Sequence, residues 1–162
     1  MRNFKLLLII AFITFISCSS GDDMDTTPMI QEVKATLDLN ALANIAGNDV
    51  TALIKFNGVA ADQYTSDVIP GDQVTYKIET NDPTTIVRFK KYEYTTGSTD
   101  LWECLKPINT DGWLVGLMVN EAATENNVEV KFNIQFQLEV NGTLQTQNTY
   151  IIDPKIKIRS SR

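Results

Sequence analysis

The stretch from Val128 to Ile152 constrains the fold of this chain more than any other part of the sequence. From Val128 to Val140, apolar and polar residues alternate without interruption, which is typical of a β-strand with one buried side and one solvent-facing side. Asn141 and Gly142 then supply a turn, because both tolerate positive φ, and a second strand-like run continues to Ile152. The pattern predicts a long β-hairpin whose apolar face is covered by a second sheet.

The apolar positions after the turn favour one turn type over another. A two-residue loop would leave three apolar side chains facing water, where they could not contribute to the hydrophobic core. A three-residue loop over 140–142, with Gly142 in the left-handed region, pairs Glu139 with Thr143 and keeps all three on the buried side. These side chains are Leu144, Tyr150 and Ile152. We therefore expect the three-residue loop.

Several other segments alternate in the same way between turn-forming residues. We expect further strands over residues 30–39, 50–56, 74–78, 86–94, 113–119 and 155–158. The Asn57-Gly58 turn is expected to have two residues, because only that length keeps the following apolar residues in phase. Residues 40–48 suit a short helical turn, and residues 95–111 are expected to form a long irregular loop.

One of these strands changes phase within its length. Val87 and Phe89 share one parity in the run 86–94, whereas Tyr92 and Tyr94 share the other. A β-bulge inserts one extra residue into a strand and would place all four side chains on one face. We therefore expect a bulge at Lys90-Lys91.

The strand pattern predicts an all-β fold. About eight or nine short strands with regularly spaced turns and no internal repeat are typical of sandwiches and barrels. We expect an immunoglobulin-like or related Greek-key β-sandwich. The alternative is an up-and-down β-barrel of the lipocalin type, although no Gly-x-Trp sequence opens the first strand as it does in lipocalins.

The first residues have the form of a secretory signal peptide. Arg2 and Lys5 precede an apolar run over residues 6–16, and a small residue and Cys18 follow. As a helix, this run is too short to cross a hydrocarbon core of ~30 Å. We expect residues 1–17 to be removed from the mature protein.

The end of this signal resembles the lipobox of bacterial lipoproteins in the segment Phe15-Ile16-Ser17-Cys18. In that family the cysteine becomes the new N-terminus and carries lipid, palmitate included, so the resemblance implies lipidation of Cys18. Phe15 stands where Leu is usual and Ile16 where a small residue is usual, which matches the looser lipoboxes of Bacteroidota. The resemblance implies an outer-membrane lipoprotein facing the periplasm or the cell surface; ordinary signal-peptidase cleavage is the alternative.

The residues after Cys18 divide into a linker and one domain. Residues 18–29 are rich in Ser, Gly, Asp and Thr, and they are expected to form a flexible acidic tether. Their first part resembles the leader of surface-exported lipoproteins in Bacteroidota, and a simple solvated linker explains it equally well. Residues 30–162 are long enough for a single β domain with a real core, and no family is recognised for them.

The composition excludes several classes of function. Loss of Arg2 and Lys5 with the signal changes the net charge from −6 to −8, which argues against nucleic acid as a partner. The chain has no histidine, so His-dependent triads and most catalytic zinc sites are excluded. Cys104 has no cysteine partner if Cys18 is lipidated, and we expect a small buried thiol. We expect neither an enzyme nor a cofactor nor a metal site.

Two surfaces remain as candidate binding sites. Trp102 lies in the expected loop and is the aromatic residue that core packing explains least. Trp113 to Val119 is apolar on both faces, so Leu114 and Met118 face either a covering layer or a partner. The other aromatic residues that could face sugar rings are Trp113, Tyr92, Tyr94 and Tyr64. Of these, Trp113, Tyr92 and Tyr94 are expected to be core more often than ligand-binding.

Loop carboxylates and amides could also supply oxygen ligands for calcium. They are Asn48-Asp49, Asn81-Asp82 and Asp111, and turn formation explains each of them equally well. The leading expectation is therefore a membrane-anchored, non-catalytic lipoprotein that binds an envelope protein or another envelope component. A glycan-binding accessory lipoprotein is the alternative.

Overall fold

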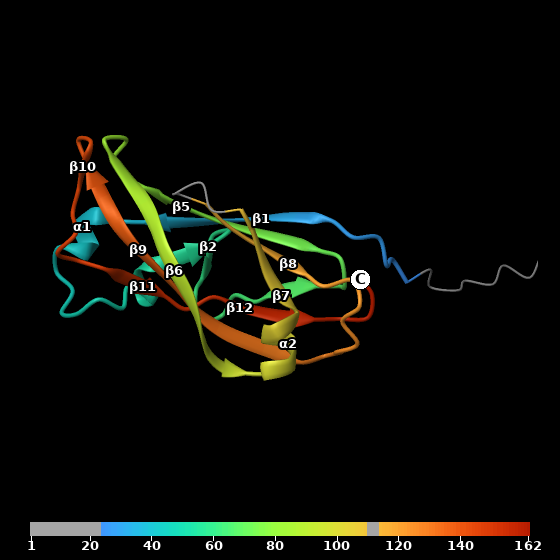
Figure 1. The fold of residues 1–162 in the computed structure, drawn as a ribbon. Coiled ribbons are helices and arrows are strands. Elements are labelled where there is room, and N and C mark those ends of the chain that lie inside the picture. The colour runs from blue at the N-terminus through green and yellow to red at the C-terminus, as the bar shows by residue number, and fades with distance from the viewer. Residues whose placement is uncertain (1–23, 110–113) are drawn as a thin grey trace, which may run out of the picture.

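The computed structural model describes residues 24–109 and 114–162, and at positions 109, 114 and 115 it describes the backbone alone. Most of the described chain is β-strand, and the two α-helices have four and six residues (Figure 1). The elements are β1 (Ile30–Leu37), α1 (Leu39–Leu42), the 3-10 helix η1 (Thr51–Leu53), β2 (Ile54–Phe56), β3 (Val59–Ala60), β4 (Ser66–Val68), β5 (Gln73–Thr80), β6 (Thr85–Gly97), α2 (Thr99–Cys104), β7 (Leu105–Asn109), β8 (Leu114–Val119), β9 (Glu129–Val140), β10 (Thr143–Leu144), β11 (Tyr150–Ile152) and β12 (Lys155–Ile158).

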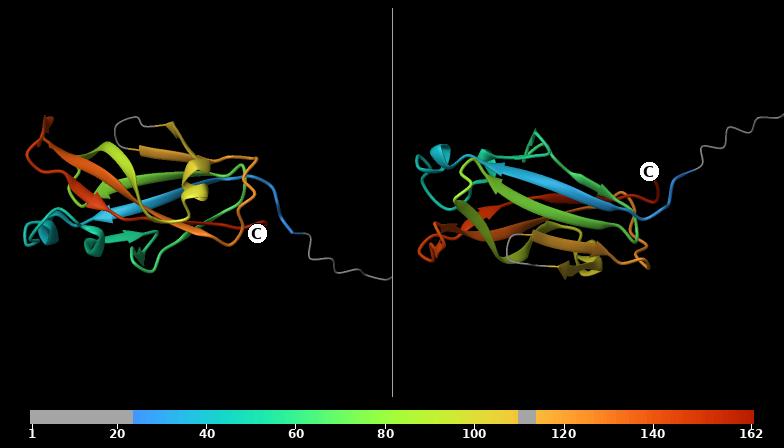
Figure 2. Two further views of the ribbon diagram at one scale, coloured as in Figure 1. Left: turned by 60° about the horizontal axis from the view of Figure 1, so that its bottom comes forward. Right: turned by 90° about the horizontal axis from the view of Figure 1, so that it is seen from above.

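The strands form two sheets that pack face to face, as the two views of Figure 2 show. Sheet A has the order β3-β2-β1-β5-β8-β7. In sheet B, β6 pairs along one side of β9, while β10, β11 and β12 follow one another along its other side and β4 pairs with β12. The predicted all-β sandwich is confirmed. The barrel alternative is wrong, because the described strands form two separate sheets.

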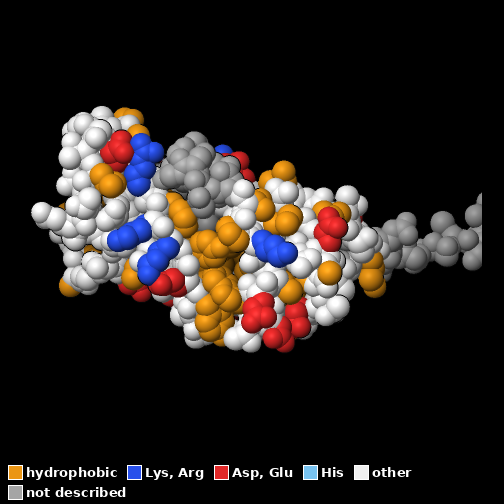
Figure 3. Space-filling model, in the orientation of Figure 1, with side chains coloured by type: hydrophobic (Ala, Val, Ile, Leu, Met, Phe, Trp, Pro, Cys, Tyr) orange, Lys and Arg blue, Asp and Glu red, His pale blue; other side chains and the backbone are white. Residues whose placement is uncertain are grey.

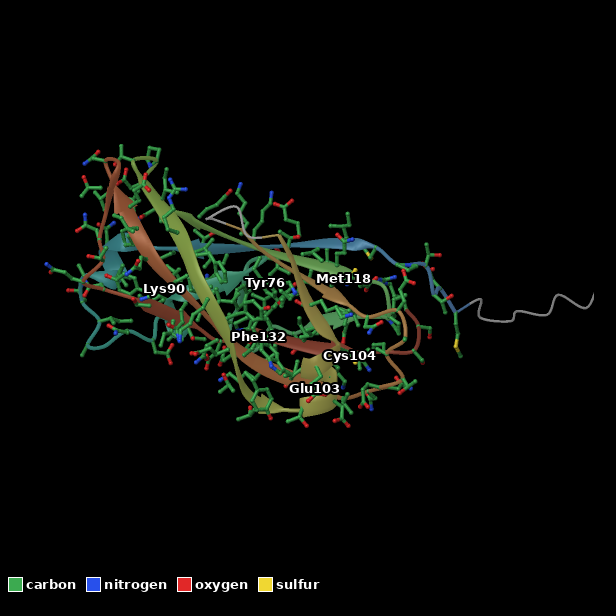
Figure 4. All side chains as sticks on the ribbon, viewed as in Figure 1. Tyr76, Lys90, Glu103, Cys104, Met118 and Phe132 are labelled. Carbon is green, nitrogen blue, oxygen red and sulfur yellow. The ribbon has the colours of Figure 1, made fainter. Side chains whose placement is uncertain are left out.

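Strand β9 provides the centre of the core, as its alternation predicts. Its inward side chains are fully buried or nearly so: Val130, Phe132, Ile134, Phe136 and Leu138. Phe132 meets Tyr76 of β5 across the two layers, with ring centroids 5.9 Å apart, and Figure 4 shows both rings between the sheets. The Tyr76 hydroxyl lies 3.2 Å from Ser66 Oγ, and burial raises the pKa of this tyrosine well above its usual range.

The three-residue loop expected after β9 is wrong. Thr143 pairs with Val140, and Asn141 and Gly142 form a two-residue turn with φ of 49° and 77°. Such a turn has the twist that matches a hairpin, and it leaves Leu144 42% exposed. The residues between β10 and β11 then shift the register. Tyr150 consequently pairs with Phe136, and the apolar side chains of β11 return to the buried face.

Other predicted turns, helices and strands are present, some with different first or last residues. The Asn57-Gly58 turn has two residues, since Phe56 pairs with Val59. Helix α1 occupies the start of the segment 40–48, where a helical turn was expected. The strand expected over 50–56 is shorter, because Asp49 Oδ1 accepts a hydrogen bond from the N–H of Thr51 and the chain makes η1 before β2. No helix among the described residues is long and apolar enough to span a membrane.

The carboxylate of Asp72 links the start of the domain, at Met29, to Arg162. Asp72 is fully buried, and its oxygens accept hydrogen bonds from the N–H of Met29 at 2.8 Å and of Ile69 at 2.9 Å. Arg162 Nη2 forms an ion pair with the same carboxylate, and Arg162 Nη1 donates to the carbonyl of Thr27 at 2.6 Å. A buried charge needs both an ionic partner and hydrogen bonds, and Asp72 has them.

Part of the expected tether, residues 25–29, is held against the sandwich. The carbonyl of Asp25 accepts a hydrogen bond from the N–H of Arg162 at 2.9 Å. Pro28 packs so closely on Gly71 that there is no room for a side chain at position 71: an added Cβ would lie 2.7 Å from Pro28 Cγ. The chain therefore enters the domain at one end of the sandwich along a fixed path (Figure 1).

Candidate binding surface

Trp102 lies on helix α2, not on the irregular loop that the sequence predicts. The loop expected over 95–111 is wrong, because β6 runs to Gly97 and is followed by α2 and β7. Ser98 caps the helix, since its Oγ accepts a hydrogen bond from the N–H of Leu101 at 3.1 Å. Leu101 is fully buried, so it anchors α2 and directs the next residue, Trp102, to a half-buried position.

The β-bulge expected in β6 is confirmed, and it gathers aromatic rings on one face. Phe89 pairs with Phe136 of β9, and Tyr92 pairs with Ile134, so Lys90 is the extra residue between them. A second irregularity lies between Tyr94 and Thr96. Without the extra residue, Tyr92 and Tyr94 would point to the opposite face from Phe89.

Four rings on β6 and α2 form a continuous row that we call the aromatic stripe: Phe89, Tyr92, Tyr94 and Trp102. The ring centroids of Phe89 and Tyr92 are 6.3 Å apart, and those of Tyr92 and Trp102 are 5.6 Å apart. The Trp102 ring lies 6.0 Å from Tyr94 and 5.8 Å from the buried Phe132. Tyr94 is 37% exposed. The stripe is therefore anchored in the core and open to solvent on its outer side.

The aromatic stripe lies where the two sheets part at one edge of the sandwich. Helix α2 connects β6, at the edge of sheet B, to β7, at the edge of sheet A, and the two strands diverge from it (Figure 1). Figure 3 shows a band of apolar side chains over this region. The burial of Tyr92 raises the pKa of its hydroxyl. The stripe offers apolar contact with polar hydroxyl tips, as aromatic binding surfaces do.

Charged side chains of β6 lie on the outer face of sheet B, on the opposite side of the strand from the stripe. Arg88 Nε donates to Glu139 Oε2 of β9 at 2.7 Å, and this hydrogen bond lowers the pKa of the Glu139 carboxyl. Lys91 Nζ and Glu93 Oε1 form an ion pair at 2.5 Å on the outer face of sheet B. Lys90 is the bulged residue, and Figure 4 shows its side chain away from α2. Strand β6 thus carries more basic than acidic side chains, in a chain that is acidic as a whole.

The second predicted surface is the outer face of β8. Met118 pairs with Gln73 of β5 and with Lys106 of β7, and it is half-buried. Leu114 pairs with Lys77, but its side chain lies outside the described part of the structure. Long polar side chains thus flank both apolar positions. This face is mixed in character, whereas the aromatic stripe is continuous.

The remaining candidates occupy different places. Cys104 ends α2 and is a half-buried thiol with no disulfide partner in the described chain. Tyr64 packs against the buried Phe56 at 5.5 Å, away from α2. Cys18 and Trp113 lie outside the described residues.

The side chains considered as possible calcium ligands make hydrogen bonds within turns and to neighbouring segments. Asp82 Oδ1 accepts from the N–H of Thr84 at 2.9 Å, and these bonds lower the pKa of the Asp82 carboxyl. Asn81 Oδ1 accepts from the N–H of Leu39, and Asp49 Oδ1 accepts from the N–H of Thr51. Asp111 lies outside the described residues, and among those described no group of three or more metal-ligating side chains comes together. These residues stabilise turns.

The phase change in β6 predicts that Tyr92 and Tyr94 share the face of Phe89, and the bulge at Lys90 confirms it. The sequence did not predict that Trp102 joins these rings, because its place depends on the packing of α2. Lys90 itself was missed as a possible contact residue. It stands at the bulge, and bulged residues often adjoin binding sites.

Comparisons with known proteins support the fold. No protein-family model matches the chain, and no curated protein matches it either. Among solved structures, the chain is similar to the inclusion body protein PixA of Burkholderia cenocepacia, with a TM-score of 0.56 and 7% sequence identity. The similarity covers 82% of this chain and 96% of that one. At this identity it shows a shared sandwich fold and nothing of function.

Proposed function

We propose that this chain is a lipid-anchored protein of the bacterial outer membrane whose β-sandwich is a non-catalytic binding module. Its anchor is the lipid on Cys18, and its contact surface is the aromatic stripe. The partner is a protein or another component of the cell envelope. The observation that carries the proposal is the row of packed but part-exposed rings at the open edge of the sandwich.

Binding energy in protein recognition comes mainly from a few aromatic or arginine side chains in a well-packed setting. Trp102 and Tyr94 meet this description, because each is fixed by ring contacts and keeps part of its surface in water. The chain has no histidine, so it lacks the commonest general base for catalysis. Binding without chemistry is the function that these residues serve best.

A glycan is the alternative partner, because tyrosine and tryptophan rings can stack on sugar rings. The ring tilts favour a protein instead. The Trp102 ring makes angles of 67° with Tyr92 and 53° with Tyr94, so the three rings do not form one flat platform. An uneven apolar surface suits protein side chains of varied shape better than flat sugar rings.

A comparison of two substitutions tests which surface binds. We expect Tyr94→Ala to reduce capture of outer-membrane components at least tenfold, since Tyr94 is the most exposed ring of the stripe. Met118→Ala removes an apolar side chain from the outer face of sheet A and serves as the control. Capture is measured by quantitative pull-down, with a glycan array run beside it. If Met118→Ala is the variant that loses its partners, the stripe is the wrong surface.

We expect Cys18→Ala to abolish lipidation. Metabolic labelling with a fatty-acid analogue should mark the wild-type protein and leave the variant unmarked. The variant should also leave the membrane fraction, because the lipid on Cys18 is the proposed anchor. Equal labelling of both proteins would refute the anchor.

A further inference from the structure

Strand β6 has one unpaired edge beside the aromatic stripe. It is 13 residues long and pairs along one side with β9, while no strand in the described chain pairs with its other side. The facing edge of β7 is less able to pair, because Pro107 has no N–H and an irregularity follows it. An exposed strand edge offers unpaired N–H and C=O groups to an incoming chain, so of the two edges beside the aromatic stripe β6 is the one better able to accept a strand.

A strand added to this edge would lie over the aromatic stripe. Side chains at matching positions of neighbouring strands point to the same face of a sheet. Tyr92 and Tyr94 point inward from β6, like their partners Ile134 and Phe132 on β9. Alternate side chains of an added strand would therefore point inward beside Tyr92, Tyr94 and Trp102 and cover the exposed part of these rings.

The two irregularities of β6 limit the length of such pairing. They lie between Phe89 and Lys91 and between Tyr94 and Thr96. Bulges bend an edge and discourage long, unspecific pairing with other chains. Beside the exposed rings of Tyr92 and Tyr94, an incoming segment keeps one register along residues 91–94, so its side chains must supply much of the specificity.

The charges of β6 select an acidic segment. The strand carries Arg88, Lys90 and Lys91 against Glu93, whereas the whole chain has a net charge of −6. Arg88 and Lys91 already pair with Glu139 and Glu93. Lys90 Nζ donates to the neutral Thr149 Oγ1 at 3.2 Å, and no carboxylate of the described chain lies within ion-pair distance of it. Thr149 directly precedes β11, which lies on the other side of β9 from the unpaired edge, so the flexible Lys90 side chain must turn towards that edge to meet a carboxylate there. A carboxylate on the incoming segment would then give Lys90 an ionic partner. If the incoming strand were β6 of a second copy of this chain, it would bring basic side chains next to basic side chains. Like charges repel, so a second copy is disfavoured as the partner.

We propose that the unpaired edge of β6 binds an extended, acidic peptide segment of a partner protein. The segment pairs with the main chain along residues 91–94, places alternate apolar side chains on the aromatic stripe, and directs a carboxylate to Lys90. This inference rests on the proposed function, because it names the class of partner for the same surface.

The test is selection of a displayed library of random twelve-residue peptides on the purified wild-type protein. We expect the enriched peptides to alternate apolar and polar positions and to carry Asp or Glu. Methylation of the peptide nitrogens that face β6 should weaken binding at least tenfold, while methylation of the alternate nitrogens serves as the control and changes it little. Lys90→Glu should weaken binding about fivefold or more, through the lost ionic partner.

Several results would overturn this inference. They are an absence of enrichment, equal effects of both methylation patterns, enrichment of basic peptides, and a concentration-dependent dimer that excludes the peptides. If the peptide experiments give one of these results but Tyr94→Ala still loses its envelope partners, edge pairing is wrong and the proposed function is retained. Conversely, if selected peptides bind β6 while Tyr94→Ala keeps its envelope partners, edge pairing holds and the proposed function fails.

Discussion

Asp72→Ala is expected to lower the free energy of unfolding by about 3–5 kcal/mol, the usual cost of breaking a buried ion pair. The substitution removes the acceptor for the N–H groups of Met29 and Ile69, and it leaves Arg162 without its carboxylate. Buried donors without partners carry a desolvation penalty. The midpoint of thermal unfolding should fall by on the order of 10 °C. Residues 25–29 should also become sensitive to protease, because Asp72 no longer binds both Met29 and Arg162.

The control for this substitution is Asp67→Ala. Asp67 also forms an ion pair with an arginine, Arg159, at 3.0 Å, but the two side chains are 56% and 42% exposed. Exposed pairs contribute about 0–1 kcal/mol. If Asp72→Ala and Asp67→Ala lower the free energy of unfolding equally, the buried contacts of Asp72 with Met29, Ile69 and Arg162 do not stabilise the domain as proposed.

Gly97→Ala is expected to cost about 3 kcal/mol or more, and to disturb the aromatic stripe as well. Gly97 has φ +105°, and an added Cβ would lie 2.3 Å from the carbonyl oxygen of Glu129 and 2.9 Å from Val130 Cα. Both contacts are with the backbone of β9, so a side-chain rotation cannot relieve them. The end of β6 must move away from β9, and α2 with Trp102 moves with it. Chemical denaturation measures the cost, and Trp102 fluorescence reports the movement when both proteins also carry Trp113→Phe, which removes the second tryptophan.

Gly47→Ala separates the clash from the backbone conformation. Gly47 has nearly the same φ, +106°, and a Cβ there meets nothing within 4 Å. This substitution should cost about 1–2 kcal/mol through its left-handed φ alone. If the two variants lose equal stability and Trp102 fluorescence is unchanged in both, the close approach of β6 to β9 does not fix the stripe.

The parts of the fold that depend on local pattern could be predicted from the sequence. The alternation around Phe132 gives β9, and the phase change around Lys90 gives the bulge in β6. Register across a turn is less local. The two-residue turn at Asn141-Gly142 has the twist that the hairpin needs, although it leaves Leu144 exposed. The residues between β10 and β11 then shift the pairing with β9, so that apolar side chains of β11 are buried again.

Features that depend on distant residues could not be predicted. Asp72 looks like an ordinary turn residue after Pro70-Gly71, and its burial depends on Met29 and Arg162, far away in the sequence. The parallel pairing of β1 with β5 likewise joins distant segments. Helix α2 is too short for a periodic pattern, so only the cap at Ser98 marks it. The aromatic stripe combines both kinds of feature: the sequence names its rings, and tertiary packing brings Trp102 to them.

The most direct test of the central claim is hydrogen–deuterium exchange of the protein with and without the partner that it captures from outer membranes. Exchange maps the contact surface without choosing a residue in advance. The account predicts slower exchange in the presence of the partner over residues 91–104, which carry the exposed part of the aromatic stripe, and little change over β1 and β5. Protection confined to the outer face of sheet A, with residues 91–104 exchanging as in the free protein, would contradict it.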